Sequence, residues 1–223
     1  MSQLSHSKAL VKKNLKVFWN LANIITYSRI LLVFLIIFLV YTKNLYSRLF
    51  ALLLLVLIFF MDWLDGFVAR KYHLATAFGG VVDVAGDRIV ENSLWISFAY
   101  LQLIPLWAPL IVISRSFITD GVRSFVLSKG KTTFAMMESW LGRQLVSSRW
   151  SRGLYGISKG VVFGLLILDY SLKTQRFMFL VKYNHILPVL DVLVYGLVIF
   201  VVALCVVRGV LTIYDSRKYF YQE

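Results

Sequence analysis

The sequence predicts an all-α membrane protein with six transmembrane helices and a basic amphipathic segment at its N-terminus. The first observation is composition: of 223 residues, 59% are hydrophobic and 16% are charged, whereas soluble domains contain about 45–50% apolar and about 25% charged residues. The second is that the apolar residues form long runs, such as 92–113 and 186–207, which is typical of membrane spans. The third is a net charge of +13, which in so hydrophobic a chain favours anionic lipid or a phosphorylated substrate over nucleic acid as a partner.

The individual elements follow from these runs and from the residues that interrupt them. Residues 1–20 are rich in lysine and are expected to lie on the membrane surface as an amphipathic segment. A tight turn at Pro105–Pro109 would join the third and fourth helices, and residues 129–152 would form a polar loop or an interfacial helix. The six spans are expected at residues 24–43, 47–70, 84–104, 106–128, 153–172 and 186–212. We interpret residues 1–223 as one membrane domain, with the six-helix core over 21–223.

Charge and cysteine content indicate orientation and exclude some kinds of site. Lys and Arg residues are more numerous on the side that holds both termini, so both termini are predicted to be cytoplasmic. The first 19 residues carry four lysines without an apolar core, so no cleavable signal peptide is expected. Cys205 is the single cysteine, which excludes a disulfide within one chain and a cysteine-based metal site.

Four aspartates lie around the connection between the second and third predicted helices. Asp62 and Asp65 are three residues apart and share one helix face, and Asp83 and Asp87 are four apart on the next helix. The connection is short, so antiparallel helices would bring both pairs to the same end. Four convergent carboxylates suit Mg²⁺ or Mn²⁺. Two such ions about 3.5–4 Å apart would act on both sides of a phosphoryl displacement.

The alternative interpretation of these acids is that they are solvated helix ends. Four like charges without a cation would repel one another strongly. The bases near them in the sequence are Arg70, Lys71 and Arg88. This repulsion favours a bound cation over solvated ends.

Small residues surround the aspartates. Gly66, Ala69, Gly79 and Gly80 would let a ligand or another backbone approach closely, and ordinary helix packing is the alternative. Arg70 could pair with a diphosphate or anchor the helix at the membrane edge.

The segment 62–87 resembles the signature of the CDP-alcohol phosphotransferase family, also called the CDP-alcohol phosphatidyltransferases. Its residues are Asp62-Trp-Leu-Asp65-Gly66-Phe-Val-Ala69-Arg70, then eight residues, Gly79, three residues, Asp83, three residues and Asp87. The resemblance implies a six-helix fold, two Mg²⁺ or Mn²⁺ ions held by the four aspartates, and a CDP-alcohol bound near Gly66, Ala69, Arg70 and Gly79. It also implies that Asp87 is the general base and that CMP leaves, and it suggests a homodimer.

A polar edge runs along the first helix. Asn23, Thr26 and Arg29 are spaced by three residues, and this pattern resembles the start of the phosphatidylglycerophosphate synthases, although Ala22 stands where a proline is common. We expect Asn23 and Thr26 to contribute to CDP-lipid binding. The alternative is that these residues cap the N-terminus of the helix and that the long Arg29 side chain reaches the membrane surface.

Charged residues also interrupt the fourth and fifth helices. Arg115 and Arg123 are eight residues apart, and Lys159 lies in the fifth helix. Charges inside membrane helices are by default functional or paired, and a phosphorylated acceptor would need such cations. We therefore predict that Arg115, Arg123 and Lys159 bind the acceptor phosphate. Ion pairing of Asp120 or Glu91 with these bases is the alternative.

The predicted activity is phosphatidyl transfer from CDP-diacylglycerol to a small phosphorylated alcohol, with glycerol 3-phosphate favoured and the active site facing the cytoplasm. Ser116 and Arg88 depart from the glycerophosphate-using branch, so inositol phosphate, cardiolipin-type and ether-lipid synthesis stay open. A divalent-cation carrier is the alternative from another class, although the acids are concentrated on the second and third helices and no repeat is visible. A basic lipid-binding scaffold would not need four aspartates.

Overall fold

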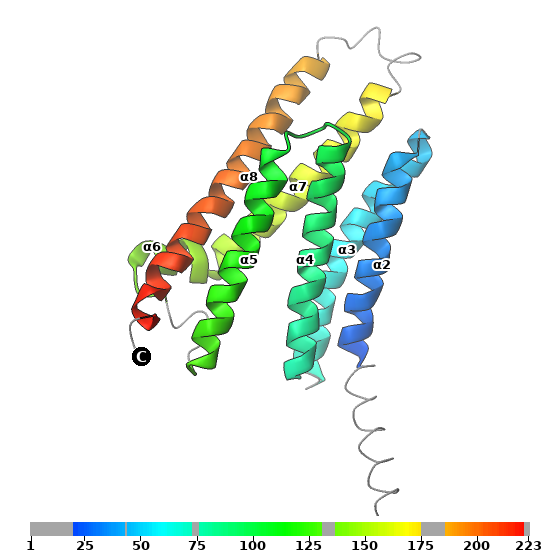
Figure 1. The fold of residues 1–223 in the computed structure, drawn as a ribbon. Coiled ribbons are helices and arrows are strands. Elements are labelled where there is room, and N and C mark those ends of the chain that lie inside the picture. The colour runs from blue at the N-terminus through cyan, green and yellow to red at the C-terminus, as the bar shows by residue number, and fades with distance from the viewer. Residues whose placement is uncertain (1–19, 43, 73–75, 131–136, 175–185, 221–223) are drawn as a thin grey trace, which may run out of the picture. The chain divides into compact units, whose positions relative to one another are not determined.

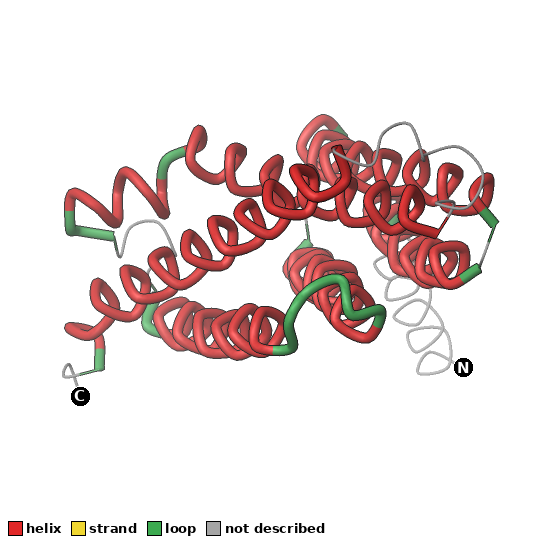
Figure 2. The backbone as a smooth tube through the Cα atoms, turned by 90° about the horizontal axis from the view of Figure 1, so that it is seen from above, coloured by secondary structure: helices red, strands yellow, loops and turns green. Residues whose placement is uncertain are grey.

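The computed structural model describes residues 20–42, 44–72, 76–130, 137–174 and 186–220. These residues form helices and short connections, with no strand among them (Figures 1 and 2). The elements are α2 (Leu21–Tyr41), α3 (Leu45–Lys71), α4 (Ala77–Tyr100), α5 (Trp107–Ser128), α6 (Trp140–Gly142), the π-helical turn η1 (Arg143–Ser147), α7 (Arg149–Thr174), α8 (Ile186–Ser216) and the 3₁₀ turn η3 (Arg217–Tyr219). The all-α prediction is confirmed for this part of the chain. Residues 1–19 of the predicted amphipathic segment lie outside it.

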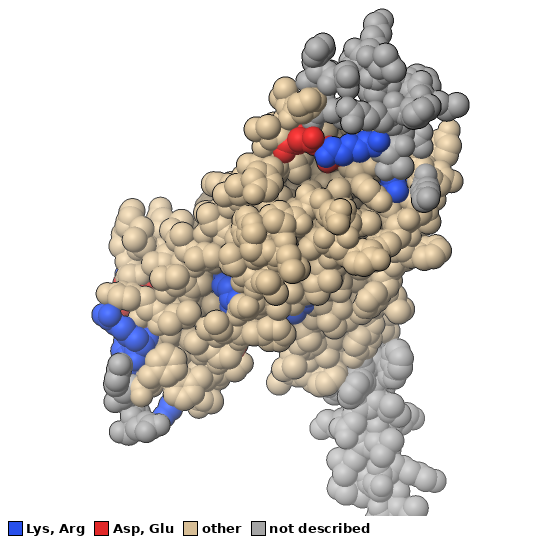
Figure 3. All heavy atoms as spheres, turned by 45° about the horizontal axis from the view of Figure 1, so that its top comes forward, with Lys and Arg blue, Asp and Glu red and all other residues tan. Residues whose placement is uncertain are grey.

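Each of the six predicted spans corresponds to a long helix, and four of these helices are long and apolar enough to cross a membrane. They are Leu21–Tyr41, Leu45–Val68, Arg149–Lys173 and Pro188–Tyr219. In α4 and α5 the charged residues lie within the helix rather than close to its ends, so six membrane crossings remain a prediction. Figure 3 shows one face on which most described atoms belong to uncharged residues. This surface and the four apolar helices indicate an integral membrane protein.

The connection between α4 and α5 begins earlier than the predicted turn at Pro105–Pro109. The helix ends at Tyr100, and Gln102 adopts a left-handed backbone with φ of 58°. Backbone hydrogen bonds from Gln102 to Ala99 and from Leu103 to Phe98 close the end of the helix, which is the Schellman pattern. The predicted helix 84–104 is therefore too long at its C-terminus, because this left-handed residue ends it before the prolines.

The chain divides into two compact units, Met1–Leu94 and Trp95–Glu223, and the boundary falls within α4. In the first unit α2 packs along α3. Their buried apolar side chains include Val33, Ile36 and Ile58. Asn44 begins α3 by accepting a hydrogen bond from the Tyr46 backbone N–H at 2.9 Å. A single domain over 1–223 stays a prediction.

In the second unit α8 packs against both α5 and α7. The ring of Phe163 on α7 contacts Trp95 at 5.3 Å and Phe98 at 5.6 Å, measured between ring centroids. A smaller apolar cluster joins the end of α5 to the segment before α7 and to the end of the chain. Its buried members are Val126, Met137, Val146 and Tyr219.

Candidate metal and CDP-lipid site

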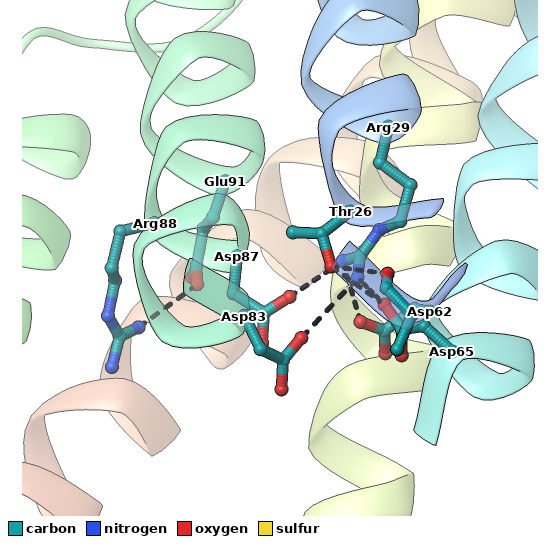
Figure 4. A network of polar contacts seen from close by, with 9 residues as sticks. Thr26, Arg29, Asp62, Asp65, Asp83, Asp87, Arg88 and Glu91 are labelled. Atoms are coloured by element: carbon teal, nitrogen blue, oxygen red, sulfur yellow. Dashed lines mark hydrogen bonds and ion pairs between the residues drawn. The ribbon is translucent and has the colours of Figure 1, made fainter. Parts of the chain in front are cut away.

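The four predicted aspartates converge within the first unit, and the guanidinium of Arg29 lies between them (Figure 4). Asp62 and Asp65 come from the last turns of α3, whereas Asp83 and Asp87 come from the first turns of α4. The three- and four-residue spacings place each pair on one face of its helix. The predicted convergence of the two pairs is thus found in the structure.

The contacts of Arg29 extend to every one of these carboxylates. Its Nη2 lies 2.6 Å from Oδ1 of Asp62 and 2.6 Å from Oδ1 of Asp87. Its Nη1 lies 2.8 Å from Oδ2 of Asp65 and 3.8 Å from Oδ1 of Asp83. The Arg29 side chain is only 4% exposed, so one buried cation offsets part of the repulsion among four acids.

The donor set fits a hard divalent cation. One carboxylate oxygen from each of Asp62, Asp83 and Asp87 lies within 4.8 Å of the others. These three side chains are about half exposed, whereas Asp65 is buried. Carboxylate oxygens that converge at an accessible edge are the ligands that Mg²⁺ and Mn²⁺ take in proteins.

The protonation of Asp83 is sensitive to this environment. Asp83 precedes the predicted span 84–104, and its helix α4 is not among the candidate spans. Partial burial, together with the nearby charges of Asp87 and Asp65, raises its pKa to about 6, and the charge of Arg29 opposes the rise. A bound divalent cation would have to displace the proton from such a group.

The polar edge of α2 reaches this site because glycines of α4 allow close approach. A Cβ at Gly79 would lie 3.0 Å from Oδ1 of Asn23, and a Cβ at Gly86 would lie 2.5 Å from the methyl group of Thr26. The Thr26 hydroxyl lies 3.5 Å from Oδ2 of Asp65 and donates to it. Asn23, Thr26 and Arg29 are all buried, and Thr26 and Arg29 contact the aspartates. The buried Arg29 side chain therefore does not reach the membrane surface, whereas the role of Asn23 in CDP-lipid binding stays a prediction.

The remaining predicted CDP-lipid residues lie on the same two helices. Gly66 follows Asp65 in α3. The side chains of Ala69 and Arg70 lie outside the described part of the chain, so their roles stay predictions. Arg88, one of the bases near the acids in the sequence, pairs with Glu91 at 3.4 Å and is directed away from the four aspartates (Figure 4).

A second, basic cluster lies in the second unit and contains part of the predicted acceptor pocket. The side chain of Arg115 packs over Gly209 of α8, where a Cβ would lie 2.7 Å from its Cγ. Arg115 also interacts electrostatically with Arg208, the residue that precedes Gly209 in α8. The Arg208 guanidinium donates to the Leu145 carbonyl and, at 2.9 Å, to the Ser151 hydroxyl.

Tyr155 joins Lys159 to the same cluster. The Lys159 Nζ lies 4.7 Å and the Arg208 Cζ 5.1 Å from the centroid of the Tyr155 ring. Both contacts are of the cation–π type. Arg208 and Tyr155 also line a cavity of about 280 Å³. Arg123 forms an ion pair with Asp120 at 3.6 Å, which is the pairing that the sequence left open as its alternative.

Two arginines of these clusters escaped the sequence prediction of site residues. The sequence placed Arg29 on a polar edge of its helix, but the spacing of residues along α2 does not reveal partners on α3 and α4. Arg208 stands alone among apolar residues of α8. A lone charge within an apolar span is the signal that could have identified it.

Comparisons with known proteins place the chain in a family. A family model described as CDP-alcohol phosphatidyltransferase matches residues 19–195, which is most of the chain. A protein of Rickettsia typhi named "CDP-diacylglycerol--glycerol-3-phosphate 3-phosphatidyltransferase" is 34% identical over 107 residues, covering 48% of this chain and 60% of that protein. A protein of the same name from Bacillus subtilis is 34% identical over 76 residues, covering 34% and 39%.

A protein of Mycobacterium tuberculosis named "Probable phosphatidylglycerophosphate synthase" is 27% identical over 155 residues, which are 68% of each chain. The match to the Rickettsia relatives is shorter: this chain spans about 60% of their length.

Proposed function

This chain belongs to the CDP-alcohol phosphatidyltransferase family, and from that premise we propose that it transfers the phosphatidyl group of CDP-diacylglycerol to a small phosphorylated alcohol in phospholipid biosynthesis. Glycerol 3-phosphate is the favoured acceptor. The observation that carries the proposal is the convergence of four carboxylates from α3 and α4 on one point. The names of the similar proteins support the choice of donor and acceptor.

The four aspartates would hold two Mg²⁺ or Mn²⁺ ions. Bound ions supply charge neutralisation for the diphosphate and for the departing CMP. Asp62, Asp65 and Asp83 are assigned as ligands, and Asp87 as a ligand that also acts on the acceptor. Asn23 and Thr26 on α2, with Gly66, Ala69, Arg70 and Gly79 along α3 and α4, are proposed to hold the CDP-lipid.

In the proposed reaction an oxygen of the acceptor hydroxyl attacks the phosphorus that carries the diacylglycerol. The new P–O bond forms as the P–O bond to CMP breaks, and CMP leaves with that electron pair. Asp87 takes the proton of the hydroxyl. An aspartate is a weak base, so correct placement of the hydroxyl against this carboxylate has to supply much of the rate enhancement.

The basic cluster of the second unit is proposed to select a phosphorylated acceptor. Arg115, Lys159 and Arg208 concentrate positive charge on one part of that unit, and arginine binds phosphate oxygens through two parallel hydrogen bonds. Arg123 is retained as a fourth candidate, although Asp120 neutralises part of its charge. We also propose a cytoplasmic active site and termini, and a homodimer.

The test is the identity of the lipid product. Purified protein in detergent is given CDP-diacylglycerol with glycerol 3-phosphate, glycerol, inositol, inositol phosphate or phosphatidylglycerol, and the lipids are analysed by mass spectrometry. We expect phosphatidylglycerophosphate, and a larger rise in acceptor KM than in donor KM for Arg115→Gln. A different product would replace the acceptor assignment. Cation flux in liposomes, without CMP release from CDP-diacylglycerol in the presence of any acceptor, would overturn the enzyme and support the carrier.

A further inference from the structure

Arg29 occupies the place at which the four carboxylates meet. Its two terminal nitrogens contact all of them, at 2.6 Å to Asp62 and Asp87, 2.8 Å to Asp65 and 3.8 Å to Asp83. The side chain is 4% exposed.

A divalent ion bound by these acids would use the same oxygens. Mg²⁺ lies about 2.0–2.1 Å from its oxygen ligands and demands near-octahedral geometry around itself. The Oδ1 atoms of Asp62 and Asp87 are each in contact with Nη2 of Arg29. An ion bound to those two oxygens would be adjacent to a guanidinium of the same sign, and the two cations would repel each other at close range.

We propose that Arg29 is the resident counter-ion of the metal-free protein, and that divalent ions displace its guanidinium from at least Asp62 and Asp87 when they bind. Metal binding is then an exchange of one cation for others at a preassembled group of carboxylates. This inference rests on the proposed metal-dependent function.

The way in which Arg29 is held suits a displaceable group. Its contacts with the aspartates are made by the terminal nitrogens, and its Nε has no hydrogen-bond partner among the described residues. A rotation within the flexible side chain would therefore withdraw both terminal nitrogens together. The α2 backbone need not move, which matters because Thr26 is packed closely against the Gly86 position of α4.

The exchange has two consequences for the molecule. Without metal, Arg29 keeps like charges on α3 and α4 from driving the helices apart, because an uncompensated group of partly buried carboxylates is strongly destabilising. Arg29 also donates a hydrogen bond to Oδ1 of Asp87. The proposed base is thus engaged in an ion pair until metal releases it.

The test compares Arg29→Gln with the wild-type protein in detergent, using Mn²⁺ affinity by titration calorimetry and the unfolding temperature with EDTA or with saturating Mn²⁺. We expect Arg29→Gln to bind Mn²⁺ at least about tenfold more tightly, because a competing unit charge within about 4 Å is removed. We also expect it to unfold at a lower temperature in EDTA and to regain most of that loss with Mn²⁺. Ser28→Ala is the control, since the Ser28 hydroxyl donates to the Ile24 carbonyl of its own helix at 2.9 Å, and it should change neither quantity.

Weaker or unchanged Mn²⁺ affinity in Arg29→Gln would overturn the exchange, because it would mean that Arg29 stays with the carboxylates around the bound ion. An equal loss of unfolding temperature with and without Mn²⁺ would do the same. Should Arg29→Gln fail to fold, Arg29→Lys decides: its single ammonium contacts fewer carboxylates, so Mn²⁺ affinity must rise above the wild-type value. If wild-type protein binds no Mn²⁺ or Mg²⁺, the proposed metal-dependent function falls, and the exchange falls with it.

Discussion

At the scale of single residues, Asp87 differs from the other three aspartates in its assigned role. It is assigned both as a metal ligand and as the base for the acceptor hydroxyl. We expect Asp87→Asn to lower kcat by about 10²–10⁴-fold, because an amide cannot accept the proton. The affinity for CDP-diacylglycerol should change only a few-fold.

Steady-state CMP release and equilibrium binding of the CDP-lipid measure these two effects. Asp62→Asn serves as the comparison, since loss of a ligand should weaken metal and CDP-lipid binding as well as turnover. Retention of wild-type kcat in Asp87→Asn would remove the base assignment.

Proton competition at Asp83 predicts a pH dependence of metal binding. Its pKa of about 6 in the metal-free protein means that the group is mostly ionised at pH 7.5 and mostly protonated at pH 5. Since the metal binds the ionised form, the apparent Mn²⁺ affinity should be nearly constant above pH 7 and fall by about tenfold per pH unit below the pKa. Titration calorimetry between pH 5 and 8 measures this, and Asp83→Asn should make the profile shallower. A profile that is level down to pH 5 in the wild type would contradict it.

Sequence spacing was sufficient to predict the aspartates but not their partner. The intervals between Asp62 and Asp65 and between Asp83 and Asp87 place side chains on common helix faces, which is a local property. The contact with Arg29 depends on how α2 packs against two other helices, and no local pattern encodes that packing. The same reasoning applies to Arg208, whose contacts with Leu145 and Ser151 come from a segment more than fifty residues away.

At the scale of elements, Gly86 controls how closely α2 approaches α4. A Cβ there would lie 2.5 Å from the Thr26 methyl group, and a buried β-branched side chain has little freedom to move. Gly86→Ala should therefore destabilise the protein by about 1–3 kcal/mol.

The matched control is Gly80→Ala on the same helix, where nothing lies within 4 Å of the added Cβ. Thermal unfolding of both variants in detergent separates the clash from the gain in helix propensity that they share. Equal stability of the two variants would show that α2 and α4 are not packed as described.

The segment containing α6 and η1 is attached to α8 by Asp215. This buried carboxylate accepts hydrogen bonds from the Ser139 hydroxyl at 2.8 Å and from the Ser139 backbone N–H at 3.4 Å. Asp215→Ala should cost about 1–3 kcal/mol and increase trypsin cleavage at Arg143. Glu138→Gln removes only the exposed ion pair with Lys218 and should cost less than about 1 kcal/mol. Similar cleavage rates in the two variants would exclude Asp215 as the attachment point.

Helix ends were predicted less well than helix positions. All six expected spans overlap long helices, because apolar periodicity extends over many residues. The end of α4 was misplaced because Gln102 adopts a left-handed backbone conformation, which a glutamine does not predict. The interfacial stretch 129–152 was predicted only as a loop or helix, and its π-helical turn depends on contacts with α8 that lie far away in the sequence.

At the scale of the whole molecule, composition predicted a helical membrane protein, and the four apolar helices agree with it. The charges of α4 and α5 lower the hydropathy of the remaining two crossings, and three of them, Asp83, Asp87 and Arg115, belong to the two candidate clusters. An ionisable group in these helices indicates a functional site but disfavours burial in lipid. The prediction of function and the prediction of membrane spans therefore conflict here. The division of the chain into two units has no counterpart in the sequence pattern, because α4 continues across the boundary.

The central claim is that metal held by the four aspartates drives release of CMP from CDP-diacylglycerol. The most direct measurement is CMP release by the purified protein with CDP-diacylglycerol and glycerol 3-phosphate, made with Mg²⁺, with EDTA, and with Asp62→Asn in place of the wild type. The account predicts that CMP and lipid product form in equal amounts with Mg²⁺ and that no CMP above background forms with EDTA. It also predicts that CMP release recovers when Mg²⁺ is restored. CMP release that persists in EDTA or in Asp62→Asn would contradict it.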